Sequence, residues 1–261
     1  MKKYILSIDQ GTTSSRVVLY DNKFQIKNIE QKEFKQYFPN DGWVEHDAEE
    51  IWKDVKQLIF QTIKKNNLKP SQIISMGITN QRETTVLWNK KTGKPIYKAI
   101  VWQDRRTADY CDQLKNKKKD KIIQKITGLV LDPYFSATKI RWILNKTSKN
   151  ITDQDTNILF GTIDTWLLWK LTEGRSHYTD ITNASRTMIY DSKKEEWSKE
   201  LLKLFKIDKS ILPEVKENAF NFGSTKLFGG NIVIGGMAGD QQAATIGQAC
   251  FNAGQSKSTY G

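Results

Sequence analysis

A polar turn near the start of the chain carries side chains suited to phosphate chemistry. Apolar residues at 4–8 and 17–20 flank the turn, and this pattern predicts two strands joined as a β-hairpin. Gly11 can adopt positive φ and let the backbone approach an anion closely. Hydroxyls and backbone N–H groups can cradle phosphate oxygens, an arginine adds a matching fork, and a strand-end carboxylate can hold Mg²⁺. These features are supplied by Asp9, Gly11, Thr12, Thr13, Ser14 and Arg16. The segment predicts a phosphate-binding hairpin, with an ordinary polar turn as the alternative.

Four later segments add polar and aromatic residues in a fixed order. They span residues 77–85, 102–106, 134–143 and 236–242, and the last is a glycine-rich run ending in Gly239-Asp240-Gln241-Gln242. Together with residues 9–16 they resemble signature segments of the FGGY carbohydrate-kinase family, and the resemblance extends from residue 4 to residue 261. It implies ATP-dependent phosphorylation of a small polyol or sugar with Mg²⁺, and it favours glycerol, converted to glycerol 3-phosphate, as the acceptor.

The resemblance also implies roles for single residues. The acceptor contacts would be Arg82, Glu83, Trp102, Tyr134, Asp240 and Gln241. Arginine can donate hydrogen bonds, glutamate can accept them, tyrosine and glutamine can do both, and an indole ring can cover the carbon chain. Asp240 would be the catalytic base, because a primary alcohol holds its proton too tightly to attack unaided. The alternatives are a surface ion pair for Arg82 and Glu83, core aromatic rings for Trp102 and Tyr134, and a helix N-cap for Asp240.

The hydrophobic pattern predicts an α/β domain. Strands are expected at 4–9, 16–21, 25–34, 73–79 and 232–234, and helices at 47–63, 105–115, 166–171 and 197–205, with further helices starting at Asp132-Pro133 and Asp240. A second hairpin is expected from residues 84–88 and 94–97, with short strands at 99–103 and 159–163. The resemblance implies a ribonuclease-H-like, actin-type fold with a mixed central sheet flanked by helices. We expect one domain over residues 1–261.

The amino-acid composition argues against nucleic acid and a membrane as partners. The net charge is +12, but only seven of the 41 basic residues are arginine and the lysines alternate with acidic residues, so we do not expect nucleic-acid binding. No stretch approaches the roughly 20 apolar residues of a membrane span, and the apolar opening is too short for a signal peptide. Two distant cysteines, Cys111 and Cys250, suggest neither a disulfide framework nor a zinc site. A cytoplasmic location follows as the expectation.

The end of the sequence limits the expected activity. FGGY kinases have two domains with the active site between them, whereas this sequence ends at Ser258-Thr259-Tyr260-Gly261. We therefore expect an N-terminal kinase domain whose nucleotide-binding C-terminal partner domain is absent, with little activity alone, and a homo-oligomer for the complete enzyme. Glycerol and ATP or ADP are the expected small-molecule partners. A kinase for another polyol or a pentulose, or a non-catalytic polyol-binding fragment, are the competing interpretations.

Overall fold

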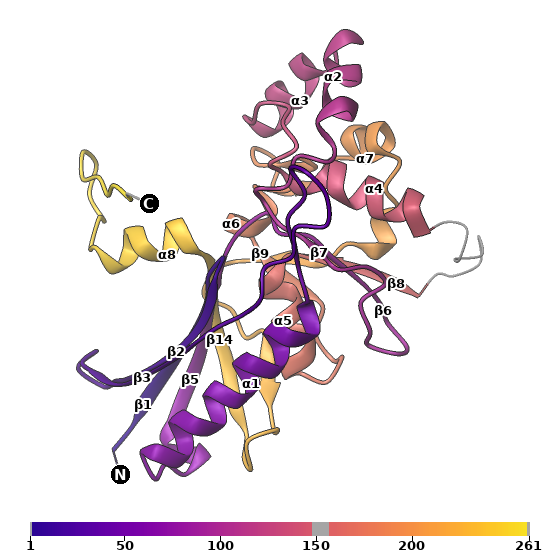
Figure 1. Ribbon diagram of the computed structural model, residues 1–261. Helices are drawn as coiled ribbons and strands as arrows, with labels where there is room; N and C mark the ends of the chain where they lie inside the picture. The colour runs from indigo at the N-terminus through magenta and orange to yellow at the C-terminus, as the bar shows by residue number, and fades with distance from the viewer. Residues whose placement is uncertain (1, 148–156, 260–261) are drawn as a thin grey trace.

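The structure is a computed structural model that describes residues 2–147 and 157–259. Its centre is a six-stranded sheet in the order β13-β14-β5-β1-β2-β3 (Figure 1). The strands β1, β5 and β14 are parallel, and β2, β3 and β13 extend the sheet antiparallel on either side. Their bounds are β1 Tyr4–Gln10, β2 Ser14–Asp21, β3 Ile26–Glu33, β5 Ile73–Asn80, β13 Gly223–Thr225 and β14 Ile232–Gly239. The expected α/β fold with a mixed sheet flanked by helices is therefore confirmed.

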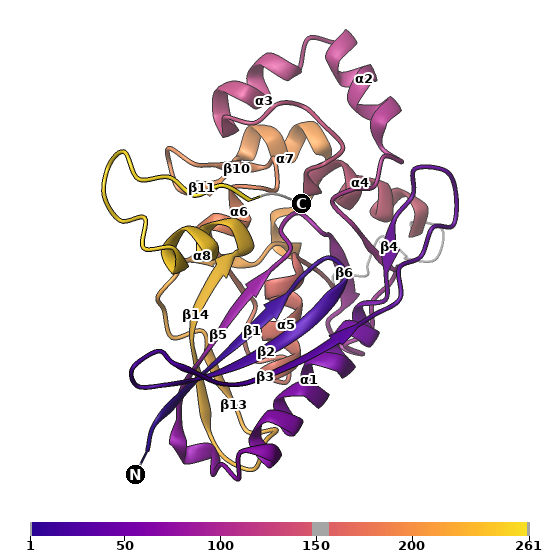
Figure 2. The same cartoon turned by 60° about the vertical axis from the view of Figure 1, so that its left-hand side comes forward.

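One face of the sheet packs against helix α1 (Ala48–Lys65) and helix α5 (Ile163–Leu171) (Figures 1 and 2). Leu6 and Ile8 alternate along β1 and are fully buried, as are Ile51 and Val55 of α1, because a strand turns every second side chain to the same face. Asp47 caps α1 by accepting hydrogen bonds from the backbone N–H groups two and three residues on, at 3.0 and 3.2 Å. This helix and its N-terminal start agree with the sequence prediction.

A second hydrophobic cluster lies beyond one end of the sheet, at the top of Figure 1. It is formed by β6 (Val86–Asn89), β8 (Ile158–Gly161), α2 (Ala108–Asn116), α3 (Asp120–Thr127), α4 (Ser136–Thr147) and α7 (Lys199–Phe205). A buried ion network joins this cluster to the loop before α1. Arg106 contacts Asp104 at 2.7 Å and Glu45 at 2.9 Å, and its guanidinium lies 3.8 Å from the centre of the Trp43 ring. The network fixes the start of α2 relative to that loop.

Several predicted elements are corrected by the structure. The expected second hairpin is present but short: the Asn89 N–H donates to the Lys94 carbonyl and the Ile96 N–H to the Leu87 carbonyl, both at 2.9 Å, and Trp88 and Pro95 form a bridge. The longer partner of β6 is β8, which was not predicted. Helix α4 begins at Ser136 and not at Asp132, whose side chain accepts the Tyr134 N–H at 2.8 Å and so stabilises a turn. The strand expected at 99–103 is limited to β7 (Ala99–Ile100), and the glycine run after residue 234 continues β14 as a strand. Helix α3 was not predicted.

Three parallel strands end side by side. Gln10 at the end of β1 lies opposite Asn80 at the end of β5, and Asn80 lies opposite Gly239 at the end of β14. The segments that follow these strands contain the phosphate hairpin, Arg82 with Glu83, and Asp240. The sheet therefore brings three distant parts of the chain to one edge. Among the described residues, no helix is both long and apolar enough to span a bilayer.

Candidate active site

Asp240 and Arg82 form an ion pair at this edge of the sheet. Arg82 follows β5, Asp240 begins helix α8 (Asp240–Gly247), and Arg82 Nε lies 3.1 Å from Asp240 Oδ1. The N-cap residue of α8 is Gly239, so the structure does not use the Asp240 side chain as the cap. Asp240 Oδ1 also accepts the adjacent Gln241 N–H at 2.7 Å. About 40% of the Asp240 side chain is exposed, which leaves its carboxylate accessible to a small molecule.

Glu83 lies beside this pair and is almost completely buried. Its carboxylate accepts a hydrogen bond from Arg186 Nε at 2.6 Å. Burial raises the pKa of Glu83, whereas the charges of Arg186 and Arg82 lower it, and the net shift is upward. The Glu83 backbone has φ of 64°, a left-handed conformation that non-glycine residues adopt rarely and often at functional sites. Ser136 donates a hydrogen bond to the Glu83 carbonyl at 2.9 Å, which helps to hold this conformation.

Trp102 contacts both the predicted acceptor residue Tyr134 and the hairpin of β1 and β2. Its indole Nε1 donates a hydrogen bond to Thr12 Oγ1 at 3.0 Å, and its ring lies 5.4 Å from that of Tyr134. Tyr134 is half-buried, and burial is the main cause of its raised pKa, with the charge of Glu83 acting in the same direction. Three backbone carbonyls around Tyr134 accept hydrogen bonds from the buried Lys139 ammonium, including that of Tyr134 itself at 2.5 Å. The rings of Trp102 and Tyr134 thus form one aromatic surface, and Lys139 holds the backbone that carries Tyr134.

The hairpin between β1 and β2 forms as predicted. Asp9 and Arg16 lie opposite each other on the two strands, with Arg16 Nη1 3.5 Å from Asp9 Oδ2. The Gly11 N–H donates to the Ser14 carbonyl at 2.9 Å and closes the turn. Gly11 does not adopt the positive φ considered for it. A Cβ atom at this position would lie 3.3 Å from the Ser14 carbonyl oxygen, so a larger residue would make a tight contact in the turn.

The Asp9 carboxyl group lies in the field of two nearby charges. Burial is the main cause of its raised pKa, the Arg16 charge opposes this shift, and the Asp240 charge adds to it. A carboxylate oxygen is a ligand that Mg²⁺ accepts, but no group of three or more His, Cys, Asp or Glu side chains gathers among the described residues. Asp9 as a Mg²⁺ ligand therefore stays a prediction.

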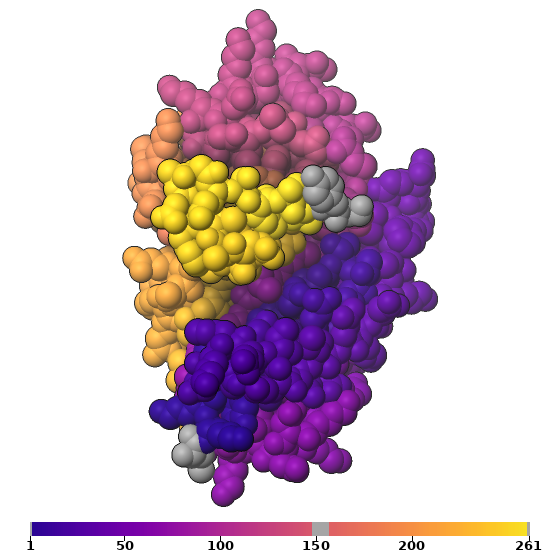
Figure 3. Space-filling model, turned by 90° about the vertical axis from the view of Figure 1, so that its left-hand side faces the viewer, coloured from indigo at the N-terminus to yellow at the C-terminus, as the bar shows by residue number. Residues whose placement is uncertain are grey.

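Gln241 is engaged differently from the other predicted acceptor residues. Its amide oxygen accepts hydrogen bonds from Lys257 Nζ at 2.6 Å and from Thr259 Oγ1 at 3.1 Å. The side chain is thus bound to the last described part of the chain. Tyr260 and Gly261 lie outside the described residues. Figure 3 shows α8 and the following residues standing out from the surface beside the hairpin of β1 and β2, with a hollow between them.

The sequence reasoning missed Arg186. This residue follows helix α6 (Ile181–Ala184), and its guanidinium lies 4.9 Å from the Phe135 ring and 5.7 Å from the Tyr134 ring. It therefore contacts both the carboxylate and an aromatic ring of the expected acceptor site. The polar run at residues 179–187 was the available signal, but its 103-residue separation from Glu83 concealed the contact.

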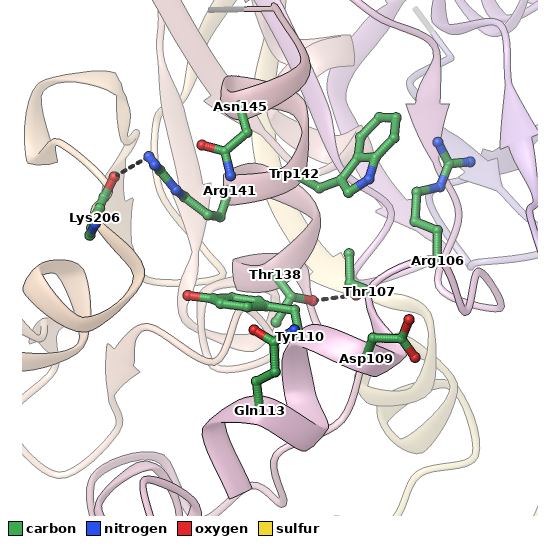
Figure 4. A pocket seen from close by; sticks show the side chains of 10 residues that line it. All are labelled: Arg106, Thr107, Asp109, Tyr110, Gln113, Thr138, Arg141, Trp142, Asn145 and Lys206. Carbon is green, nitrogen blue, oxygen red and sulfur yellow. Dashed lines mark hydrogen bonds between the residues drawn. The ribbon is translucent and has the colours of Figure 1, made fainter. Parts of the chain in front are cut away.

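A separate cavity of about 390 Å³ lies between α2, α4 and the end of α7 (Figure 4). Tyr110, Arg141 and Trp142 line it, and Arg141 donates to the Lys206 carbonyl at 3.3 Å. None of the predicted site residues lines this cavity. The predicted site is thus distinct from it, at the edge of the sheet.

Gly239 allows Arg82 to reach Asp240. A Cβ atom at this position would lie 2.4 Å from Arg82 Cδ and 2.7 Å from Arg82 Cγ. We expect Gly239→Ala to displace Arg82, to lower the free energy of unfolding by about 1–3 kcal/mol, as overpacking does, and to weaken binding of the expected acceptor. Urea unfolding and calorimetric titration would measure both effects. Gly247→Ala is the matched control, because no neighbouring atom lies within 4 Å of a Cβ atom at that position. Equal behaviour of the two variants would contradict this interpretation.

Comparisons with known proteins identify the family of this chain. Residues 4–247 match the N-terminal domain of the FGGY family of carbohydrate kinases. Curated glycerol kinases of Clostridium botulinum and Staphylococcus haemolyticus are 53% and 52% identical to the whole of this chain, which covers 53% of each of them. A crystal structure of Plasmodium falciparum glycerol kinase with ADP superposes with a TM-score of 0.93 and 40% identity, over 100% of this chain and 53% of that one. A Lactobacillus acidophilus gluconate kinase structure has a TM-score of 0.83 and 25% identity, over 95% of this chain and 50% of that one.

The matches cover all of this chain but only part of each relative. The chain spans about half the length of the curated relatives it matches. The family match lies within the same region as the six-stranded sheet and the candidate site. The chain therefore belongs to the FGGY family of carbohydrate kinases and corresponds to their N-terminal domain.

Proposed function

We propose that this chain is the acceptor-binding and base-bearing domain of an ATP-dependent glycerol kinase, which forms glycerol 3-phosphate and ADP. The observation that carries the proposal is the accessible Asp240 carboxylate, held 3.1 Å from Arg82 Nε at the edge where the phosphate hairpin also ends. The glycerol kinases that are 52–53% identical over the whole chain support glycerol as the acceptor.

The proposed reaction transfers one proton and one phosphoryl group. Asp240 takes the proton of a primary glycerol hydroxyl while that oxygen forms a bond to the γ-phosphorus of ATP. The bond from this phosphorus to the β–γ bridging oxygen breaks, and ADP leaves with the electron pair. Such transfer depends mainly on alignment and on neutralisation of charge. The ion pair with Arg82 supports the role of Asp240, because it orients the carboxylate.

We assign the glycerol hydroxyls to Arg82, Glu83 and Tyr134, with Trp102 against the carbon chain. Burial of Glu83 supports this assignment, because a buried carboxylate strongly discriminates between acceptors that do and do not supply a donor. Arg186 would keep Glu83 ionised and correctly turned. The amide oxygen of Gln241 is bound to Lys257 and Thr259, so Gln241 would contact glycerol through its amide NH₂ group.

We assign the phosphates of ATP to the hairpin formed by Gly11, Thr12, Thr13, Ser14 and Arg16. The exposed Thr13 side chain and the cross-strand pair of Arg16 with Asp9 support this assignment. The relative solved with ADP supports a nucleotide substrate. Asp9 would hold Mg²⁺, which supplies charge neutralisation for the phosphate groups when bound.

We infer that full activity needs a second domain like the remaining half of the longer relatives. The half-length match and the exposed helix α8 beside the site support this inference, because phosphoryl transfer requires two substrates to be enclosed and aligned. A cytoplasmic location and a homo-oligomeric complete enzyme stay predictions of the same proposal.

The proposal can be tested by joining the chain to the second half of the 53% identical Clostridium botulinum relative, here called the fusion. We expect the fusion to release ADP in a glycerol-dependent manner in a coupled assay, and the 261-residue chain alone to show little release. A fusion that folds and binds nucleotide, but whose ADP release does not depend on glycerol, would contradict the proposed acceptor. Gluconate and xylulose, which structural relatives are named for, would identify a different sugar acceptor in the same assay.

A further inference from the structure

The polar segment 180–186 contacts both strand ends that carry the proposed acceptor site. It begins with Asp180, the last residue of β9 (Tyr178–Asp180), continues through α6, and ends at Arg186. Asp180 and Asn183 are completely buried. Arg186 is the only residue of this segment with a part in the reaction described above, through Glu83.

Asn183 holds the end of β5. Its side-chain amide and that of Asn80 exchange two hydrogen bonds, at 3.0 and 3.1 Å. Asn80 also donates to the Gln81 carbonyl at 3.0 Å, one residue before Arg82. The position at which the chain leaves the sheet toward Arg82 and Glu83 is therefore fixed by a buried amide pair.

Thr182 holds the end of β14 in a corresponding way. The Gly239 N–H donates to Thr182 Oγ1 at 2.8 Å, and the same hydroxyl is hydrogen-bonded to Asp180 Oδ2. Thr182 Oγ1 donates its proton to Asp180 Oδ2, so the hydroxyl proton points toward the carboxylate. A lone pair of the Thr182 oxygen is then directed at the Gly239 N–H, immediately before Asp240.

Asp180 is itself oriented by further donors. It accepts hydrogen bonds from the Thr182 N–H at 2.7 Å, from Asn183 Nδ2 at 2.7 Å and from Asn218 Nδ2 at 2.8 Å. Asn218 Nδ2 also donates to the Met237 carbonyl of β14 at 2.9 Å. The carboxylate thus connects the Thr182 hydroxyl to Asn183 on α6 and to Asn218, which itself contacts β14.

We propose that Thr182, oriented by Asp180, is a positioning residue that fixes Asp240 for proton abstraction by holding the Gly239 N–H. This inference rests on the proposed kinase function. The Gly239 backbone is the only covalent link between β14 and Asp240, and the Gly239 α-carbon also packs against Arg82, the ion-pair partner of Asp240. A shift of this backbone changes the direction of the Asp240 carboxylate more than the contacts of Glu83 or Tyr134.

The first measurement is hydrogen exchange of the Gly239 N–H in the isotope-labelled 261-residue chain. Thr182→Val retains the side-chain shape but removes the acceptor, so we expect exchange of this N–H to become roughly 10-fold faster or more. Thr182→Ser retains a hydroxyl and should restore the protection. Thr179→Val is the matched control, because Thr179 is a buried threonine that donates to Asp164 at 2.7 Å and does not contact Gly239.

The second measurement is steady-state kinetics of the same variants in the fusion. We expect Thr182→Val to lower kcat by roughly 10- to 100-fold, as small misplacements of a reacting group do, with the glycerol KM changed by less than about threefold. Thr182→Ser should recover most of kcat. Thr179→Val should lower thermal stability with little effect on kcat.

The two measurements separate the inference from the proposed function. Unchanged protection of the Gly239 N–H in Thr182→Val, or a kcat equal to that of Thr179→Val, would overturn the role of Thr182. Lost protection together with a fusion that binds ATP but does not phosphorylate glycerol would instead overturn the proposed function, and with it the catalytic purpose of this contact.

Discussion

Asp240→Asn should lower the kcat of the fusion by roughly 10²- to 10⁴-fold, the usual contribution of general acid–base catalysis. Asparagine has nearly the same shape as aspartate but cannot accept a proton from glycerol at neutral pH. The Gln241 N–H can still donate to the remaining carbonyl oxygen, so the start of α8 should be retained. The glycerol KM should change by only a few-fold, because Arg82, Glu83 and Tyr134 remain in place.

The control for this experiment is Asp109→Asn, which removes a carboxylate in the first turn of α2 outside the proposed site. Both variants should be compared by thermal unfolding and by coupled assay at saturating ATP. Near-normal turnover of the Asp240 variant would show that the carboxylate orients Arg82 and does not act as the base. A large loss accompanied by unfolding would be resolved by Asp240→Glu, which should recover a measurable part of the turnover.

Propane-1,3-diol should be a poor substrate of the fusion, with kcat/KM lower than that of glycerol by on the order of 10²-fold or more. This diol lacks the middle hydroxyl, so it leaves a buried hydrogen-bonding group of the site without a partner. Glu83 is the main candidate for that group, since its side chain is only 2% exposed. Competition assays with both acceptors present would measure the ratio directly.

The variant Glu83→Gln tests the same recognition from the side of the protein. It keeps the size of the side chain but weakens the contact with Arg186 and adds a donor to the site. We expect it to reduce the preference for glycerol over the diol by about 10-fold or more, while Glu49→Gln in α1 should have no such effect. Equal kcat/KM for glycerol and the diol in the parent fusion would remove Glu83 and Arg82 from the assigned hydroxyl contacts.

The accuracy of the sequence predictions depended on the range of the interactions involved. The first hairpin, α1 and α8 were predicted because a local pattern of apolar residues or a local cap determines each of them. The pairing of β6 with β8 was not predicted, since its partner strand lies far along the chain. Helix α3 follows a lysine-rich run and was not predicted, and packing of Ile123 in the second cluster stabilises it.

The same distinction holds within the candidate site. Residues in signature segments, such as Arg82 and Asp240, were identified in advance, and the structure places these two in contact. Arg186 and Thr182 act through partners that only the folded chain brings close, and no spacing in the sequence indicates these contacts. The bond of Gln241 to Lys257 is also a tertiary contact and could not be inferred from the motif.

The side-by-side ends of β1, β5 and β14 have a consequence for how this kind of domain diversifies. The hairpin, the acceptor residues and the proposed base lie just beyond the same edge, on short segments that a common sheet supports. Substitutions in the segment after β5 can therefore alter the choice of acceptor without disturbing the packing of α1 or the base on α8. Gluconate and xylulose kinases share this fold at 25% identity. This is consistent with a sheet that is retained while the segments after its strand ends are substituted. A new acceptor preference can thus evolve in few steps, each of which retains a folded protein.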